Sequence, residues 1–114
     1  MPELQPSNPD AHRLYICGPM SAMPDFNHTA FFKAEEALLA AGFRVANPVL
    51  NGLPKDAAWE HHMKRDIALL LCCTGVATLD GWQASRGAKL EVHIARELGI
   101  QVMRLSEWVM WSGR

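Results

Sequence analysis

Short apolar runs alternate along the chain with longer segments in which apolar residues recur every three or four positions. Four apolar runs predict buried strands, at residues 14–17, 43–47, 76–79 and 101–105. Three segments with helical periodicity predict helices, at residues 28–41, 57–71 and 85–98. Asn27 and Asp56 are the candidate N-caps of the first two helices, and Gly42 and Gly99 follow the first and the third.

Strands that alternate with helices of this length are typical of βαβ units with right-handed crossovers. The pattern therefore predicts an α/β fold, a single-domain, three-layer structure with a parallel sheet of four to five strands and flanking helices, as in flavodoxin-like and Rossmann-like folds. We expect this domain at residues 12–114, after a flexible N-terminal tail at residues 1–11. Beyond the last strand, Trp108 and Trp111 are too apolar for a solvated tail, so we interpret them as a lid on the core or a dimer contact.

In parallel sheets, ligands bind beyond the carboxyl ends of the strands, where the strand order reverses. Residues 15–20 and 80–85 follow or end predicted strands, so they are the candidate ligand-binding segments. Trp82 within the second segment either stacks on a ligand or covers the edge of the core.

Two carboxylates occupy helix positions where the pattern expects apolar residues. At about 100° per residue, Glu91 falls opposite the polar stripe of the third predicted helix. Asp66 falls in the middle of the apolar face of the second. Carboxylates are rarely buried without a partner, because desolvating the charge is costly. These two positions therefore indicate a function.

Each carboxylate also has a simpler interpretation. Asp66 is then a structural acid that accepts a hydrogen bond from a backbone N–H or from Tyr15, and Glu91 is solvated at the edge of its helix. Gly87 lies one turn before Glu91 and would allow a ligand to approach closely. Paired carboxylates in a partly apolar cleft are the usual groups for cleaving glycosidic bonds, so we favour the functional interpretation.

The charge balance excludes one class of partner. The 114 residues include 11 Lys and Arg and 12 Asp and Glu, for a formal net charge of −1. Because a groove for polymeric nucleic acid needs a positive stripe, we expect a small molecule as partner instead. His61 and His62 lack the spacing of zinc ligands and are expected to be solvated, so we predict no metal and no cofactor.

The cysteines and the hydropathy indicate a compartment. Three cysteines, of which Cys72 and Cys73 are adjacent, make a poor disulfide framework and favour a reducing cytoplasm. Cys72 and Cys73 are expected to pack as small apolar side chains, and Cys17 to be buried beside the sheet. No secretory signal and no run of roughly 20 apolar residues is present, so we expect a cytoplasmic protein with no membrane partner.

Three segments resemble a known superfamily. Residues 14–21 (LYICGPMS) are similar to the opening strand and loop of the nucleoside 2-deoxyribosyltransferase superfamily, which includes the deoxynucleoside monophosphate N-glycosidases. Residues 85–91 (SRGAKLE) resemble its nucleophile helix, and residues 63–71 its intermediate acidic helix. With Gly81-Trp82 before the serine, the chain most resembles a small uncharacterised branch found in phage genomes.

The resemblance implies a role for each matching residue. Glu91 matches the nucleophile that attacks C1′ of the deoxyribose, Asp66 the acid that protonates the departing base, and Tyr15 the tyrosine that orients the nucleophile. Ser85 matches a serine that contacts the 5′-phosphate in the monophosphate hydrolases. The nucleoside transferases carry an acidic residue there, which would repel a phosphate. Ser85 is alternatively an ordinary N-cap of the third helix.

The substrate site implied by the resemblance is wider than these residues. Its substrate-binding members are Gly18, Pro19, Met20, Ser21, Asp80, Gly81, Trp82, Ser85 and Gly87. Asn47 and Asn51 are the candidates for recognising the base. Related enzymes often complete the site with a polar group from a neighbouring subunit. A homodimer or higher homo-oligomer is therefore expected, with Ser106, Ser112 or the terminal carboxylate as the contributed group.

The leading hypothesis is thus an enzyme that cleaves or transfers the N-glycosidic bond of a deoxyribonucleotide or nucleoside through Glu91. The alternative is a non-catalytic protein that binds or sequesters a nucleotide in the same pocket. A third hypothesis is hydrolysis of another N-ribosyl substrate, such as a dinucleotide, although the chain lacks an adenine-binding fingerprint.

Overall fold

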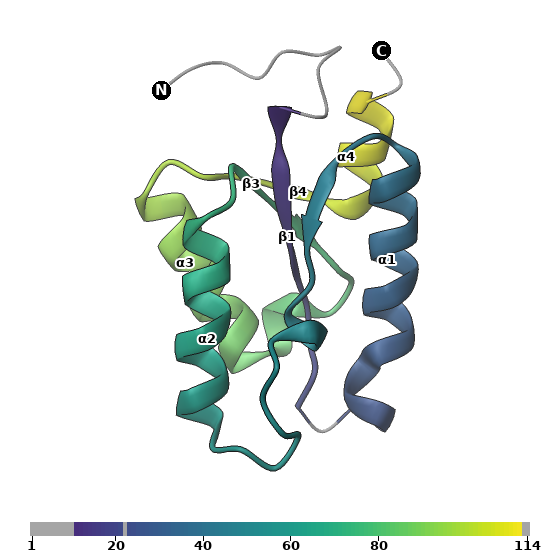
Figure 1. Cartoon of the computed structure of the whole chain (residues 1–114). Coiled ribbons are helices and arrows are strands. Elements are labelled where there is room, and N and C mark those ends of the chain that lie inside the picture. Colours follow the sequence, from purple (N-terminus) through teal and green to yellow (C-terminus); the bar gives the residue numbers. More distant parts are fainter. Residues whose placement is uncertain (1–10, 22, 113–114) are drawn as a thin grey trace.

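A computed structural model describes residues 11–21 and 23–112 of the chain (Figure 1). Its strands are β1 (Arg13–Cys17), β2 (Arg44–Ala46), β3 (Gly75–Thr78) and β4 (Gln101–Arg104). Its α-helices are α1 (His28–Ala40), α2 (Trp59–Leu71), α3 (Arg86–Glu97) and α4 (Leu105–Ser112). Three short 3-10 helices, η2 (Pro24–Asn27), η3 (Pro48–Leu50) and η4 (Trp82–Ala84), lie in the loops. The predicted tail at residues 1–11 lies, apart from Ala11, outside the described residues.

The four strands form one parallel sheet in the order β2-β1-β3-β4. The chain moves from β1 to β2, then returns across β1 to reach β3, so the direction of winding reverses between β1 and β3. Because crossovers are right-handed, this reversal puts α1 on one face of the sheet and α2 and α3 on the other. Figure 1 shows these layers, with α4 beside α1. The predicted single-domain, three-layer α/β fold is confirmed, with four strands.

The side chains of β1 alternate between two apolar clusters, as expected for a strand buried on both faces. Leu14 and Ile16 point toward α1 and α4, where the cluster also contains Phe31, Leu38 and Trp108. Tyr15 and Cys17 point toward α2 and α3, where they pack in a cluster with Leu70 of α2 and with Ala88, Val92 and Ala95 of α3. The second cluster therefore receives the polar groups of β1.

Residues 105–112 form a helix, α4, which the sequence pattern does not predict. In α4, Trp108 is fully buried and Trp111 is 7% exposed, so the interpretation as a lid on the core is correct. The Trp108 indole Nε1 donates to the backbone oxygen of Val76, 2.8 Å away. Gly75 makes room for this ring, because a Cβ there would lie 2.6 Å from Trp108.

Three local predictions are wrong. Helix α2 begins at Trp59 after Ala58, so Asp56 is exposed and does not cap it. Asn27 occupies the N-cap position of α1 but has a left-handed backbone, and its amide Nδ2 donates to Pro19 O at 2.9 Å instead of capping. Cys72 is exposed, and of the adjacent pair only Cys73 is buried.

Among the described residues, no helix has both the length and the apolar character needed to cross a membrane.

Candidate active site

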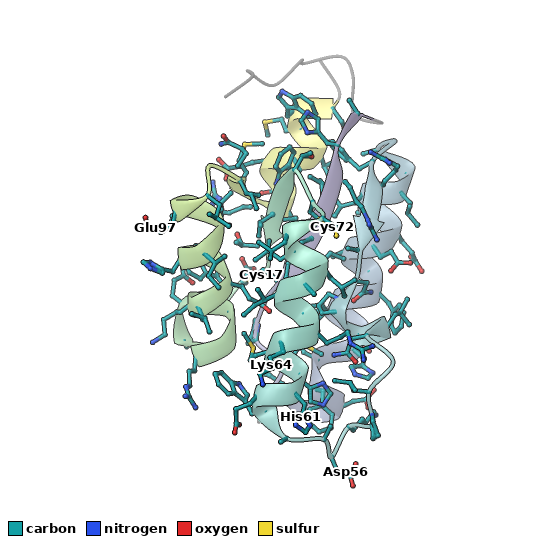
Figure 2. All side chains as sticks on the ribbon, turned by 60° about the vertical axis from the view of Figure 1, so that its left-hand side comes forward. Cys17, Asp56, His61, Lys64, Cys72 and Glu97 are labelled. Carbon is teal, nitrogen blue, oxygen red and sulfur yellow. The ribbon has the colours of Figure 1, made fainter. Side chains whose placement is uncertain are left out.

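Glu91 is buried at the centre of the face that α3 turns toward the sheet. Its side chain is 5% exposed, so the interpretation as a solvated carboxylate at the helix edge is wrong. The Tyr15 hydroxyl donates to Oε2 at 2.7 Å, and the Cys17 thiol donates to Oε1 at 3.4 Å. Figure 2 shows Cys17 of β1 in the interior between α2 and α3. Glu97, which lies on α3 like Glu91, projects outward in the same view. Two consecutive inward positions of β1 thus hold both oxygens of one carboxylate.

Burial sets the protonation of this group. Desolvation raises the pKa of Glu91 to about 7, although the hydrogen bonds from Tyr15 and Cys17 favour the ionised form. Burial also raises the pKa of the Tyr15 hydroxyl and of the Cys17 thiol well above their usual values, and the nearby Glu91 adds to both effects. Both groups therefore stay protonated at neutral pH and remain donors to the carboxylate.

Asp66 is the second buried carboxylate, on the face of α2 that points to the same region. It is 6% exposed, and its Oδ1 accepts a hydrogen bond from the Asn51 amide Nδ2 at 2.9 Å. Burial raises its pKa, while the Asn51 hydrogen bond and the nearby His62 act in the opposite direction. The partner is thus a side-chain amide, and not the backbone N–H or Tyr15 considered from the sequence.

A cavity of about 330 Å³ brings both carboxylates together beyond the carboxyl end of β1. This is the position that the reversal of strand order predicts. The predicted site residues that line the cavity are Tyr15, Gly18, Met20, Ser21, Asp66, Ser85, Gly87 and Glu91. The volume lies within the range of small-molecule sites.

Four residues expected to bind substrate do not line this cavity: Pro19, Asp80, Gly81 and Trp82. The backbone oxygen of Pro19 accepts from Asn27, which fixes the loop after β1. Trp82 packs against the edge of the apolar cluster beside α3, with the Arg96 guanidinium 5.8 Å from its ring centre. Of the two interpretations of Trp82, cover for the edge of the core is the one observed.

Ser85 and Gly87 have structural roles beside their place in the cavity wall. The Ser85 hydroxyl accepts from the backbone N–H of Ala88 at 3.2 Å and so caps α3. Its own hydroxyl proton stays available for another partner. A Cβ at Gly87 would lie 3.0 Å from the Met63 sulfur, so this glycine lets α2 and α3 approach each other. Close helix packing therefore accounts for Gly87 without a ligand.

Several cavity residues were not predicted as parts of the site. They include Phe26, His28, Lys55, Trp59, His62 and Met63. Trp59 and Met63 belong to the apolar face of α2, where the sequence pattern suggested only core packing. His62 is half-buried and contacts Asn51 and Pro54, so the expectation of a solvated side chain is wrong for His62 and holds for the exposed His61.

An exposed lysine, Lys55, is among the residues that line the cavity. The Lys55 ammonium lies 3.1 Å from the Asp25 carboxylate and 5.6 Å from the ring centre of Phe26. Asp25, Phe26 and Asn27 all have positive φ angles, between 49° and 61°. Such conformations are costly for residues with side chains, and they concentrate near functional sites.

Within the described part of the chain, no three His, Cys, Asp or Glu side chains gather as metal ligands.

Residues 12–104 match the model of a protein family that is described as a domain of unknown function, DUF4406. The chain belongs to the DUF4406 family. Every residue that lines the cavity falls within the DUF4406 segment, which ends before α4. No curated protein and no solved structure matches the chain. The family description assigns no chemistry to this site.

Proposed function

We propose that this DUF4406 protein cleaves the N-glycosidic bond of a deoxyribonucleotide or deoxynucleoside, with Glu91 as the nucleophile. The observation that carries the proposal is the environment of Glu91. This buried carboxylate lines the cavity, and its two oxygens accept hydrogen bonds from Tyr15 and Cys17. A second carboxylate, Asp66, lines the same cavity. One fixed carboxylate and a second acid are the equipment of a retaining glycosidase.

The chemistry assigns one step to each carboxyl group. A Glu91 oxygen forms a bond to C1′ as the bond from C1′ to the base nitrogen breaks, and Asp66 gives its proton to the departing base. Water then attacks C1′ and releases Glu91, and the proton of that water returns to Asp66. Because Glu91 must be ionised and Asp66 must carry a proton, activity should rise with pH as Glu91, whose pKa is about 7, loses its proton, and should fall again as Asp66 loses its own.

Three features of the cavity support a ligand that carries a phosphate. The segments around Tyr15, Asp66 and Glu91 resemble the nucleoside 2-deoxyribosyltransferase superfamily, and Ser85 stands where its monophosphate hydrolases carry a phosphate-binding serine. Ser85 also lies at the N-terminus of the 12-residue α3, where unpaired N–H groups attract anions. The Lys55 ammonium also lies among the lining residues, and its exposed ion pair with Asp25 is weak enough to be exchanged for a contact with a phosphate.

The test incubates the full chain with deoxynucleosides and their 5′-monophosphates and follows the free base by chromatography. We expect base release from at least one monophosphate, and loss of that activity in Glu91→Gln. Glu97→Gln is the matched control, because Glu97 is exposed on the same helix. Full activity of Glu91→Gln would contradict the assignment. Tight binding of an unchanged nucleotide with no product would favour the non-catalytic alternative.

A further inference from the structure

The Asn51 side chain connects Asp66 to a histidine that the glycosidic chemistry does not use. Its Nδ2 donates to Asp66 Oδ1 at 2.9 Å and lies 3.0 Å from His62 Nδ1. His62 Nε2 lies 3.0 Å from the backbone oxygen of Pro54. Because a carbonyl only accepts, Nε2 is the donor to Pro54, and in the tautomer that carries its proton on Nε2 the Nδ1 atom accepts from Asn51.

The orientation of the Asn51 amide is fixed from its other side as well. Its Oδ1 accepts from the backbone N–H of Leu53 at 3.0 Å, and its backbone oxygen accepts from Arg65 Nη1 at 3.0 Å. Rotating the amide by half a turn would place an oxygen against the Asp66 carboxylate and a donor against the Leu53 N–H. Asn51 is therefore a donor to Asp66 in the only orientation that satisfies all its neighbours.

The two oxygens of Asp66 consequently have different surroundings. Oδ1 accepts from Asn51, whereas no group within residues 11–21 and 23–112 donates to Oδ2. Among the described residues, no fully buried side-chain oxygen or nitrogen lacks a hydrogen-bond partner. Oδ2 therefore keeps some exposed surface, and because Asp66 lines the cavity we assign this surface to the cavity. Glu91 differs, because both of its oxygens accept hydrogen bonds from β1.

We infer that Asn51, oriented by His62, is a positioning residue that keeps the proton of Asp66 on Oδ2, the oxygen that opens to the cavity. The physical reason is that an unprotonated carboxyl oxygen accepts better than a hydroxyl oxygen, so the bond from Asn51 favours the proton on the opposite oxygen. The inference rests on the proposed function, in which this proton passes to the departing base nitrogen as its bond to C1′ breaks.

The neighbours of Asp66 define what a change at Asn51 should do. The titratable groups that face Asp66 are His62 on its own helix, Glu91 on α3, and Tyr15 and Cys17 on β1. The hydrogen bond from Asn51 favours the ionised carboxylate, so its removal should raise the pKa of Asp66 further. It should also free the carboxyl group to rotate, so that its proton is no longer held toward the departing base.

The kinetic experiment compares two substrates of different leaving group. One is the nucleotide that the base-release assay identifies, and the other carries 4-nitrophenolate, which departs without a proton, in place of the base. In Asn51→Leu we expect kcat for the nucleotide to fall by about tenfold or more, and kcat for the nitrophenyl substrate to change by less than about twofold. An equal loss on both substrates would overturn the inference.

Asn47 offers a matched control. It is buried, its Oδ1 accepts from the N–H two residues later, and its Nδ2 donates to a carboxylate, Glu35, at 3.0 Å. Asn47 does not line the cavity, so the expectation that it recognises the base is wrong. Asn47→Leu should therefore leave the ratio of the two kcat values unchanged. If Asn51→Leu does not fold, Asn51→Asp keeps the acceptor for Leu53 and still removes the donor to Asp66.

A titration without substrate separates this inference from the proposed function. Carbon-13 NMR of the aspartate carboxyl groups, with Asp66→Asn to assign the signal, follows Asp66 directly in the native chain and in Asn51→Leu. We expect the midpoint of Asp66 to move to higher pH in Asn51→Leu and to stay in place in Asn47→Leu. An unchanged midpoint in both variants overturns the inference. Absence of base release by the native chain would refute the function and leave this titration decisive.

Discussion

The two faces of the sheet bury different kinds of side chain. The face toward α1 and α4 is filled by aromatic and aliphatic side chains, and Phe43, Trp108 and Trp111 contact one another at ring-centre distances of 5.6–5.8 Å. The face toward α2 and α3 has a cluster of smaller side chains, and it also buries Glu91 and Asp66 near the carboxyl end of β1. One strand, β1, supplies residues to both.

The aromatic side chains that stabilise the fold and the carboxylates of the candidate site thus lie on opposite faces of the sheet. Buried aromatic rings contribute large apolar areas to stability, so the α1 and α4 face can compensate for the cost of two desolvated carboxyl groups on the other side. Each of those groups has at least one hydrogen-bond donor, which limits that cost. We therefore expect substitutions on the aromatic face to change stability, and substitutions on the carboxylate face to change pH dependence.

The largest effect should come from the aromatic face. Trp108→Ala removes a fully buried ring and its hydrogen bond to Val76, and should lower the free energy of unfolding by about 3–5 kcal/mol. Urea denaturation at fixed pH measures this loss. Met110→Ala on the same helix is the control, because Met110 is 69% exposed. A loss below about 1 kcal/mol for Trp108→Ala would mean that the aromatic face is not the main source of stability.

The second effect concerns pH and the carboxylate face. The pKa of Glu91 is raised from 4.5 to about 7 in the folded protein, so its protonated form is favoured by folding. Its contribution to stability is therefore complete below about pH 4.5 and is lost as the pH rises through about 7. We expect native stability to fall by about 3 kcal/mol more than that of Glu91→Gln between pH 4 and pH 8. Parallel pH profiles of the two proteins, measured in urea, would contradict a buried, titrating Glu91, and Glu97→Gln should follow the native profile.

The smallest changes in stability are expected from replacing one glycine on each face of the sheet. In Gly75→Ala the new Cβ would lie 2.6 Å from Trp108 and 2.8 Å from Leu14, which should cost about 1–3 kcal/mol of stability. In Gly87→Ala the nearest atom is the Met63 sulfur at 3.0 Å, and the gain of about 1 kcal/mol in helix propensity offsets the contact. Thermal or urea unfolding of both variants checks the order. A larger loss for Gly87→Ala would show that the carboxylate face is the more tightly packed one.

The sequence by itself determined the elements of this protein whose signals are local. Short apolar runs located four strands and a period of 3.6 residues located three helices, and the helical period put Glu91 and Asp66 on buried faces. Both are buried in the structure, as expected from their neighbours within one or two helical turns. The alternation of strands and helices also determined the parallel sheet and the end of it where the cavity lies.

Only the tertiary structure decided which groups meet these carboxylates. Asn51 reaches Asp66 across 15 positions and Cys17 reaches Glu91 across 74, and no local pattern encodes either contact. Helix α4 was missed because an eight-residue segment has a weak helical signal of its own and is stabilised by packing Trp108 and Trp111 against the sheet. The position of Trp82 at the edge of the core and the absence of a capping role for Asp56 likewise depended on where the neighbouring helices begin. Local periodicity specifies which face of an element is buried, whereas the partner on that face depends on how distant segments fold together.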